Sequence, residues 1–293
     1  MSQTTVGIVG LGIMGGAIAR NLAADGISVR GYDIDAARVD ALKPGVIATT
    51  SAGEAARGAD IVLTSLPSLK ALDDTVASLL AAKPAGLVVA ELSTLPIEAK
   101  EKARAALAAG GITLLDCPLS GTGAQAAARD LAVYASGERA AYDKAEPVFR
   151  RFARTSRYLG AFGNGSKMKF VANLLVAVHN VASAEAMVLG TKAGLDPETI
   201  VEVIAAGAGT SRVFELRAPL MAKHDYAPTM KIDIWQKDMA IIADFAKALG
   251  VPLPTFAASA PLYDAAQAAG LGAKDTAAVA EVIAARADAT SRK

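Results

Sequence analysis

Cysteine and histidine are scarce in this sequence of 293 residues, which has one cysteine, Cys117, and two histidines, His179 and His224. A single cysteine excludes an internal disulfide bond, and the three residues together cannot supply the ligands of a usual zinc site. We therefore expect no bound metal ion. The low cysteine content is typical of a protein from a reducing compartment.

A surplus of charge of one sign is also absent, since 30 Lys and Arg residues face 29 Asp and Glu residues. No basic surplus attracts nucleic acid or an anionic membrane surface, so we expect neither as a partner. The longest apolar stretch, residues 170–178, is too short to cross a bilayer. Because the N-terminus shows no signal-peptide pattern, we expect a cytoplasmic location.

The most informative feature of the sequence is a glycine-rich turn close to its start. A short apolar run ends in Gly10, Gly12 and Gly15, and a helical pattern follows at residues 17–24. Gly10 permits a tight turn, Gly12 lets the backbone approach a pyrophosphate, and Gly15 lets the helix pack closely on the strand. With the intervening Leu11, Ile13 and Met14, this turn predicts a cofactor-binding segment whose helical N–H groups face phosphates.

The next predicted strand ends in a carboxylate, Asp33, which lies 18 positions after Gly15. This spacing is close to the roughly 20 residues expected for an acid that binds the adenosine ribose of a dinucleotide. A carboxylate attracts the ribose 2′-hydroxyl and repels a 2′-phosphate, which favours NAD over NADP. NADP stays possible because Arg30 or Arg38 could turn toward a phosphate, although both positions also suit solvated arginines.

Strand and helix patterns alternate through the first half of the chain, which predicts a parallel sheet covered by helices on both faces. With the glycine turn, this indicates an α/β fold that begins with a doubly wound Rossmann domain over residues 1–162. Ligand contacts are expected in the loops after the strands, at Leu66-Pro67, Ser93-Thr94 and residues 116–123. The expected strands cover residues 6–9, 28–32, 61–66, 87–92, 113–116 and 131–135, and the expected helices cover 17–24, 36–42, 70–80, 97–109 and 140–152.

The second half has only helical patterns, which predicts an all-α domain over residues 163–293. A helix of about 25 residues around 167–189 lacks glycine and proline, and at 1.5 Å per residue it spans roughly 35–40 Å, enough to join two domains. Gly194, Gly250 and Gly270 are expected just past helix ends. The further helices are expected at residues 196–206, 231–249, 255–269 and 276–287.

Two polar residues at the start of the long helix are candidates for catalysis. Lys169 and Asn173 are four positions apart, so both project from one helix face. They suit an acid/base lysine and an amide that positions the substrate. They also suit a solvated lysine and a buried, hydrogen-bonded asparagine. Lys167 points about 200° away from Lys169 and is expected to be solvated.

Two further segments carry candidate binding residues. Ser120, Gly121 and Thr122 follow a strand at the cofactor edge of the sheet, and small neighbours leave backbone N–H groups open to a carboxylate. An ordinary turn is an equally good interpretation. Lys237 in the helical domain could reach a cofactor or substrate, or could pair with a neighbouring acid. His179 is expected to be a core or interface residue.

These motifs, in this order, resemble the β-hydroxyacid dehydrogenase family, which includes 3-hydroxyisobutyrate dehydrogenase and tartronate semialdehyde reductase. The resemblance covers nearly the whole chain, through residues 10–15, 116–123, 163–173 and 237–238. It implies that Lys169 is catalytic, that Ser120, Gly121 and Thr122 bind the substrate carboxylate, and that Thr94, Leu66 and Pro67 lie beside the nicotinamide and its ribose. Lys237 is implied near the cofactor, and a homodimer or homotetramer is the usual assembly.

The resemblance implies an NAD(P)-dependent oxidoreductase that acts on a short 3-hydroxy acid or its semialdehyde. The sequence departs from the family pattern at Thr122, which replaces a glycine, and at Ala172, which replaces the first of two asparagines. Both departures leave the substrate open. The alternatives are a dehydrogenase of a larger sugar acid, such as threonate or 6-phosphogluconate, and a non-catalytic dinucleotide-binding protein. Imine reductases share the architecture but usually lack the lysine, so Lys169 argues against them.

Overall fold

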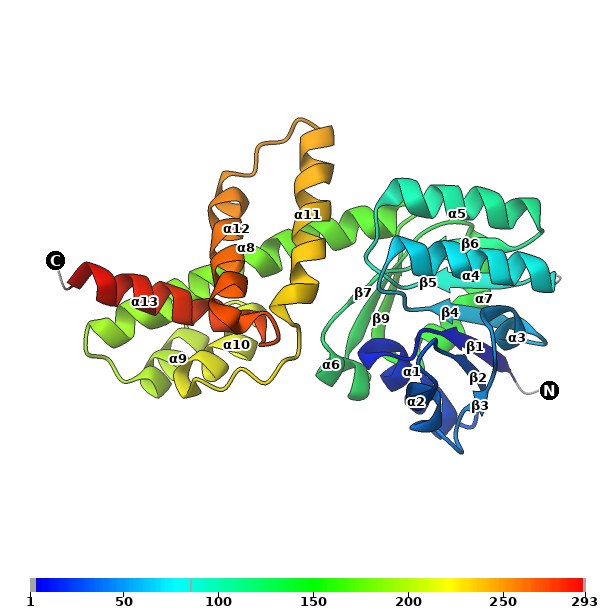
Figure 1. Ribbon diagram of the computed structural model, residues 1–293, viewed down its shortest axis with the longest axis horizontal. Helices are drawn as coiled ribbons and strands as arrows, with labels where there is room; N and C mark the ends of the chain where they lie inside the picture. Colours follow the sequence, from blue (N-terminus) through cyan, green and yellow to red (C-terminus); the bar gives the residue numbers. More distant parts are fainter. Residues whose placement is uncertain (1–3, 85, 292–293) are drawn as a thin grey trace. The chain divides into compact units, whose positions relative to one another are not determined.

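The computed structural model describes residues 4–84 and 86–291, and the chain divides into two units, Met1–Lys169 and Phe170–Lys293. Figure 1 shows the first unit as an α/β assembly and the second as a set of helices. The division falls inside one long helix, α8 (Asn164–Lys192), whose first residues belong to the first unit. The predicted α/β fold with an all-helical second part is therefore confirmed.

The first unit is built on a six-stranded parallel sheet with the order β3-β2-β1-β4-β5-β6. The chain runs outward from β1 to β3 and then returns to β4 on the other side of β1. This reversal is the point at which doubly wound sheets bind ligands. The strands are β1 (Thr5–Val9), β2 (Ser28–Tyr32), β3 (Ile47–Ala48), β4 (Ile61–Thr64), β5 (Val88–Glu91) and β6 (Thr113–Asp116), and the helices between them are α1 (Ile13–Ala24), α2 (Ala36–Asp40), α3 (Ala52–Ala56), α4 (Leu69–Ala82) and α5 (Ile97–Ala109).

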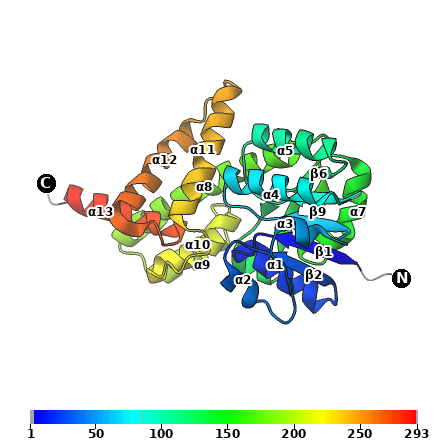
Figure 2. The same ribbon diagram turned by 45° about the vertical axis from the view of Figure 1, so that its right-hand side comes forward.

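Side chains on the two faces of this sheet enter two separate cores, because successive residues of a strand point to opposite faces. Ile8 of β1 packs in one core with Ile18 of α1. Val62 of β4 packs in the other with Leu79 of α4. Both cores are apolar on the strand side, which explains why β1, β4 and β5 are continuous apolar runs in the sequence. Figures 1 and 2 show α4 and α5 together on one side of the sheet.

The expected strand at residues 131–135 does not join this sheet, and that part of the prediction is wrong. It forms β8 (Leu131–Ala135) in a three-stranded sheet with β7 (Leu119–Ser120) and β9 (Ala153–Tyr158), two strands that the patterns did not predict. Only Cys117 and Pro118 separate β6 from β7, too few residues for the crossover that a parallel neighbour needs. β7 does not pair with β6 but pairs antiparallel with β8, and the helices α6 (Gly123–Ala127) and α7 (Arg139–Phe149) connect the three strands in sequence.

The second unit consists of helices, as predicted, with one helix more than the patterns indicated. The additional helix is α10 (Arg212–Lys223), whose interior Pro219 disguised it in the sequence. Gly270 has a φ of +80° inside the short π-helical segment Gln267–Leu271, so the expected helix at 255–269 ends earlier. The other helices are α9 (Pro197–Ala205), α11 (Ile232–Ala248), α12 (Pro254–Ala266) and α13 (Val279–Ser291), with a 3₁₀ turn at Thr276–Ala278.

Helix α8 is apolar over a longer stretch than residues 170–178 alone indicate. Among the described residues it is the one helix long and apolar enough to cross a membrane by length and composition, with a mean hydropathy of 1.4 over its best window. Its buried side carries Asn180, whose amide donates to the Tyr263 hydroxyl and the Thr276 carbonyl at 2.9 Å each. These buried polar contacts show that one side of α8 packs on protein.

Candidate active site

The glycine turn has the close contacts that the sequence predicted. Gly10 has a φ of +87°, and a Cβ atom built on Gly15 would lie 1.9 Å from the Gly10 carbonyl oxygen. A Cβ atom on Gly12 would meet only the Arg38 guanidinium, at 3.6 Å. The turn is therefore tight at Gly10 and Gly15 and open at Gly12.

Helix α1 begins at this turn without a side-chain cap and without an acidic residue in its first turn. The N–H groups at an uncapped helix start bind anions. Ile13 and Met14 are the first helical residues, and Ile13 is well exposed. The residues present therefore fit the pyrophosphate of a dinucleotide, with open backbone at Gly12 and N–H donors beside it.

Asp33 lies at the end of β2 and is held in place by the glycine turn. Its Oδ2 atom accepts a hydrogen bond from the Leu11 N–H group at 2.7 Å, and its Oδ1 atom accepts one from Asp35 N at 2.9 Å. Arg38 lies 3.5 Å from the same carboxylate, whereas Arg30 donates to the Glu54 carbonyl. Of the two arginines considered for a phosphate, only Arg38 lies beside Asp33, the carboxylate predicted to bind the ribose.

The loops after β4 and β5 are joined by a hydrogen bond. Leu66 N–H donates to the Ser93 hydroxyl at 2.7 Å, so the segment with Leu66 and Pro67 is tied to the segment with Thr94. Leu66 and Ser93 are buried, while Pro67 is exposed and Thr94 is half-buried. The structure thus brings these predicted cofactor residues to one edge of the sheet.

The predicted carboxylate-binding segment contains a short helix cap. Thr122 caps α6, since its hydroxyl accepts from Gln125 N and its own N–H donates to the Gln125 side chain at 3.0 Å. Its N–H group is therefore already bonded. Gly121 has a φ of +133°, and Ser120 is half-buried in β7. The cap thus uses the hydroxyl and the N–H group of Thr122 and involves neither Ser120 nor Gly121.

Lys169 is buried, with 8% of its surface exposed, so the interpretation of a solvated lysine is wrong. Its neighbour two positions earlier, Lys167, is exposed and contacts Asn164 at the helix start. The burial difference follows from the 200° between them on α8. Lys169 thus has the buried position that a proton-transferring amine needs.

Asn173 and Lys237 meet at one carboxylate in the second unit. The Asn173 amide donates to Asp238 Oδ2 at 2.9 Å, and Lys237 Nζ lies 3.3 Å from Asp238 Oδ1. Asn173 is buried, and the hydrogen bond from its amide nitrogen to Asp238 orients its side chain. Asp238 belongs to the motif that the sequence indicated, but its contact with Asn173 is visible only in the folded unit.

Sequence reasoning missed two fully buried charged residues, Glu91 at the end of β5 and Lys100 on α5. Lys100 Nζ lies 2.6 Å from Glu91 and 2.8 Å from Asp116 at the end of β6. In the sequence, the one sign of this cluster was that Glu91 ends an otherwise apolar strand. Burial alone would lower the pKa of Lys100, but the two carboxylates outweigh it and raise the pKa above its ordinary value.

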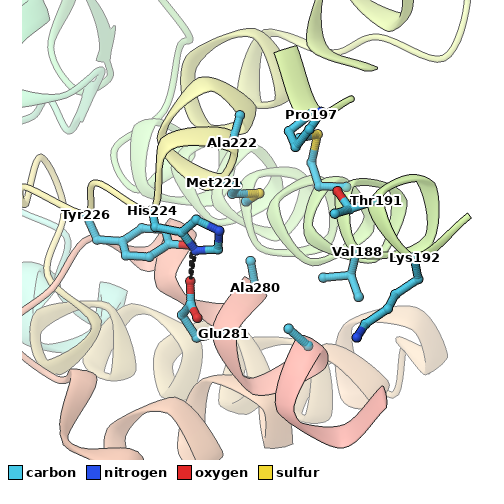
Figure 3. Close-up of a pocket in the computed structure, with 12 residues that line it drawn as sticks. Val188, Thr191, Lys192, Pro197, Met221, Ala222, His224, Tyr226, Ala280 and Glu281 are labelled. Carbon is cyan, nitrogen blue, oxygen red and sulfur yellow. Dashed lines mark hydrogen bonds and ion pairs between the residues drawn. The ribbon is translucent and has the colours of Figure 1, made fainter. Parts of the chain in front are cut away.

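A cavity of about 90 Å³ lies elsewhere, in the second unit, and contains none of the predicted site residues. Figure 3 shows His224 and Tyr226 directed toward Glu281. The His224 ring is 2.7 Å and the Tyr226 hydroxyl 2.6 Å from the same carboxylate oxygen. The side chains of His224, Tyr226 and Glu281 therefore satisfy one another's hydrogen bonds. Most of the other residues that line this cavity are aliphatic.

Comparison with known proteins identifies the family of this chain. Residues 5–160 match the family described as the NAD binding domain of 6-phosphogluconate dehydrogenase. Residues 163–283 match the family described as NAD-binding of NADP-dependent 3-hydroxyisobutyrate dehydrogenase. The L-threonate dehydrogenase of Cupriavidus necator is 35% identical over 286 residues, which cover 94% of this chain and 95% of that protein. The chain belongs to the β-hydroxyacid dehydrogenase family.

Other members of the β-hydroxyacid dehydrogenase family show the same extent of similarity. The 2-(hydroxymethyl)glutarate dehydrogenase of Eubacterium barkeri is 32% identical, with 94% of each chain covered. A crystal structure of a 3-hydroxyisobutyrate dehydrogenase from Salmonella typhimurium has a TM-score of 0.87 and 32% identity, over 96% of this chain and all of that one. The chain is thus an NAD(P)-dependent hydroxyacid dehydrogenase, as its resemblance implied.

Proposed function

We propose that this dehydrogenase oxidises the hydroxyl group of a short hydroxy acid, and reduces the corresponding semialdehyde, with Lys169 as the general acid/base. The observation that carries the proposal is the burial of Lys169 on α8, four positions before the buried Asn173. A free lysine has a pKa near 10.4, so proton transfer near neutral pH requires that the pKa of Lys169 be lowered. Burial of the amine acts in that direction.

Each predicted residue has a distinct part in this proposal. The turn from Gly10 to Gly15 and Asp33 bind the cofactor, and Leu66, Pro67, Thr94 and Lys237 surround it. Ser120, Gly121 and Thr122 hold the substrate carboxylate, and Asn173, oriented by Asp238, positions the reacting oxygen. Neutral Lys169 accepts the hydroxyl proton in oxidation, and protonated Lys169 donates it in reduction. The nicotinamide, when bound, exchanges the hydride.

Two substrate classes remain candidates. Acids of the 3-hydroxyisobutyrate or 2-hydroxy-3-oxopropionate type follow from the motifs, while the similarity to an L-threonate dehydrogenase favours L-threonate. Two arginines of the helical unit that could bind a larger polar acid have other partners, since Arg217 is buried against Asp275 and Arg212 pairs with Glu215. Phe214 and Trp235, two large side chains of the same unit, are buried. Neither the two arginines nor the two aromatic residues therefore favour 6-phosphogluconate as the substrate.

The direct test is NADH formation with a panel of acids, namely 3-hydroxyisobutyrate, L-threonate, 2-(hydroxymethyl)glutarate, 3-hydroxypropionate, glycerate and 6-phosphogluconate. We expect turnover on one of the first three and at least tenfold lower kcat/KM on 6-phosphogluconate, about 1.4 kcal/mol in the transition state. NADP is run beside NAD. Enzyme that binds NADH but turns over none of the acids would refute the proposed substrate class.

We also propose that a second copy of the chain covers the exposed apolar face of α8, which gives a homodimer or homotetramer in the cytoplasm. Val171, Leu175 and Leu189 lie on that face and are 55%, 48% and 73% exposed. Lipid is a poor alternative because the opposite side of the helix packs on protein through Asn180. A second protein chain can cover the exposed apolar face of α8 while the opposite face stays packed within its own unit.

A charge on that face is expected to dissociate the oligomer. Leu175→Glu places an acid where the proposal puts an apolar contact, so its mass by light scattering is expected to fall to that of one chain. Leu249→Glu is the matched control, since Leu249 is 61% exposed but lies at the end of α11. A wild-type monomer, or an unchanged mass for Leu175→Glu, would contradict this assembly.

A further inference from the structure

Lys100 is a fully buried cation that contacts three oxygen atoms, from the ends of two strands and the loop after one of them. It lies 2.6 Å from Glu91 and 2.8 Å from Asp116, and it donates to the Ser93 carbonyl at 2.7 Å. The residue therefore joins the end of β5, the loop that follows it and the end of β6.

The second partner, Asp116, extends these contacts to the start of α8. Its Oδ2 atom accepts from Ser166 N at 2.7 Å, and its Oδ1 atom accepts from the Ser166 hydroxyl at 2.8 Å. The two acids and one lysine carry one excess negative charge, which lies at the positive end of the α8 dipole. A Cβ atom on Gly165 would lie 2.2 Å from the Tyr134 carbonyl oxygen, so this helix start fits closely against β8.

The first partner, Glu91, extends the contacts to the predicted cofactor loops. Its Oε1 atom accepts from Ser93 N at 2.9 Å, and the Ser93 hydroxyl accepts from Leu66 N. Ser93 immediately precedes Thr94. One buried cation thus connects the loops of Leu66 and Thr94, the strand that leads to Ser120, and the helix that carries Lys169.

Stability alone does not account for such a cluster. Removing charges from water is costly, and well-packed apolar residues in place of a buried ion pair are often neutral or stabilising. What apolar residues cannot supply is directed bonding to several backbone segments at once. The cluster has that directed bonding, and its bonds lead to the segments that carry the site.

We propose that Lys100 is a positioning residue that, through Asp116 and Ser166, fixes the first turn of α8 and so the amine of Lys169. This inference rests on the proposed role of Lys169 as the acid/base. Lys169 follows Ser166 by three positions, less than one helical turn, so a shift at Ser166 moves the amine directly. Small displacements of a reacting group lower rates strongly.

The test compares Lys100→Met with Ser166→Ala, and uses Lys102→Met as the matched control because Lys102 is exposed on the same helix. Lys100→Met leaves two buried acids without their cation, so it could unfold. Ser166→Ala keeps the ion pairs and removes only the hydroxyl contact with Asp116. We measure kcat and KM on the panel acid that gives most turnover, and the number of NADH sites per chain.

A third readout needs no substrate. Trace labelling with acetic anhydride across pH gives the apparent pKa of the Lys169 amine. For Ser166→Ala we expect about tenfold lower kcat, unchanged NADH sites per chain, and a Lys169 pKa closer to that of free lysine than in the wild type. Folded Lys100→Met enzyme should show larger changes in the same direction.

Two outcomes overturn the inference. Ser166→Ala that matches Lys102→Met in kcat and in Lys169 labelling would show that the contact positions nothing. A fall of kcat only in proportion to lost NADH sites, with unchanged labelling, would show a purely structural role. Lys169→Ala is run in parallel: if it keeps wild-type turnover, the proposed function itself fails, whereas an inactive Lys169→Ala beside a normal Ser166→Ala refutes only the positioning role.

Discussion

Lys169→Ala is expected to lower kcat by a factor of about 10²–10⁴ while NADH binding stays nearly unchanged. The substitution removes the amine that accepts or donates the proton. It leaves the glycine turn and Asp33, where the cofactor is proposed to bind, untouched. Hydroxy acid oxidation by the wild type should slow as pH falls, because Lys169 must be neutral to act as a base, and aldehyde reduction should slow as pH rises. Both dependences should disappear in the variant.

Lys167→Ala is the matched control for this prediction. Lys167 lies on the same first turns of α8 but is exposed, and its side-chain nitrogen donates to the Asn164 side chain. Its loss should leave kcat and the pH profile as in the wild type. An active Lys169→Ala enzyme, with turnover at the wild-type rate, would remove Lys169 from the reaction.

Asp33→Ser is expected to reverse part of the cofactor preference. We expect kcat/KM with NAD to fall about 10- to 100-fold, because each hydrogen bond to a charged group contributes about 1.5–3 kcal/mol. NADP should improve, since the carboxylate no longer repels the 2′-phosphate and Arg38, which lies 3.5 Å from it, is released. The readout is the ratio of kcat/KM for the two cofactors.

The double variant Asp33→Ser with Arg38→Ala separates the two causes. Its NAD efficiency should match that of Asp33→Ser, but the gain with NADP should be lost. Asp35→Ser serves as the control on the same loop, because Asp35 also pairs with Arg38 but is half exposed and outside the glycine turn. An unchanged cofactor ratio in Asp33→Ser would refute the ribose-binding role of this carboxylate.

The sequence predicted the parts of the fold that local patterns determine. The glycine turn, the central parallel strands and the long helix all follow from periodicity and from glycine positions, which depend on near neighbours in the chain. The small second sheet was missed because β7 has only two residues and β9 has no apolar alternation. Such strands depend on pairing with residues far away in the chain, which local patterns do not report.

The buried cluster around Lys100 shows a different limit. In the sequence Lys100 lies within a helix that carries several charged residues, Glu98, Glu101, Lys102 and Arg104, and nothing local distinguishes it from its exposed neighbours. Its burial depends on contacts with residues 9 and 16 positions away, Glu91 and Asp116. Periodicity does not report such contacts. Arg217 is similar, since only the fold pairs it with Asp275.

The central claim, that Lys169 moves the proton during hydride transfer, is tested most directly in a single turnover. Excess enzyme is mixed with NAD and the preferred acid, and NADH formation on the enzyme is followed for wild type, Lys167→Ala and Lys169→Ala. This measurement excludes product release, which limits kcat in many dehydrogenases and similar enzymes. The account predicts a rate at least about a hundredfold slower for Lys169→Ala alone. Equal rates for all three enzymes would contradict it.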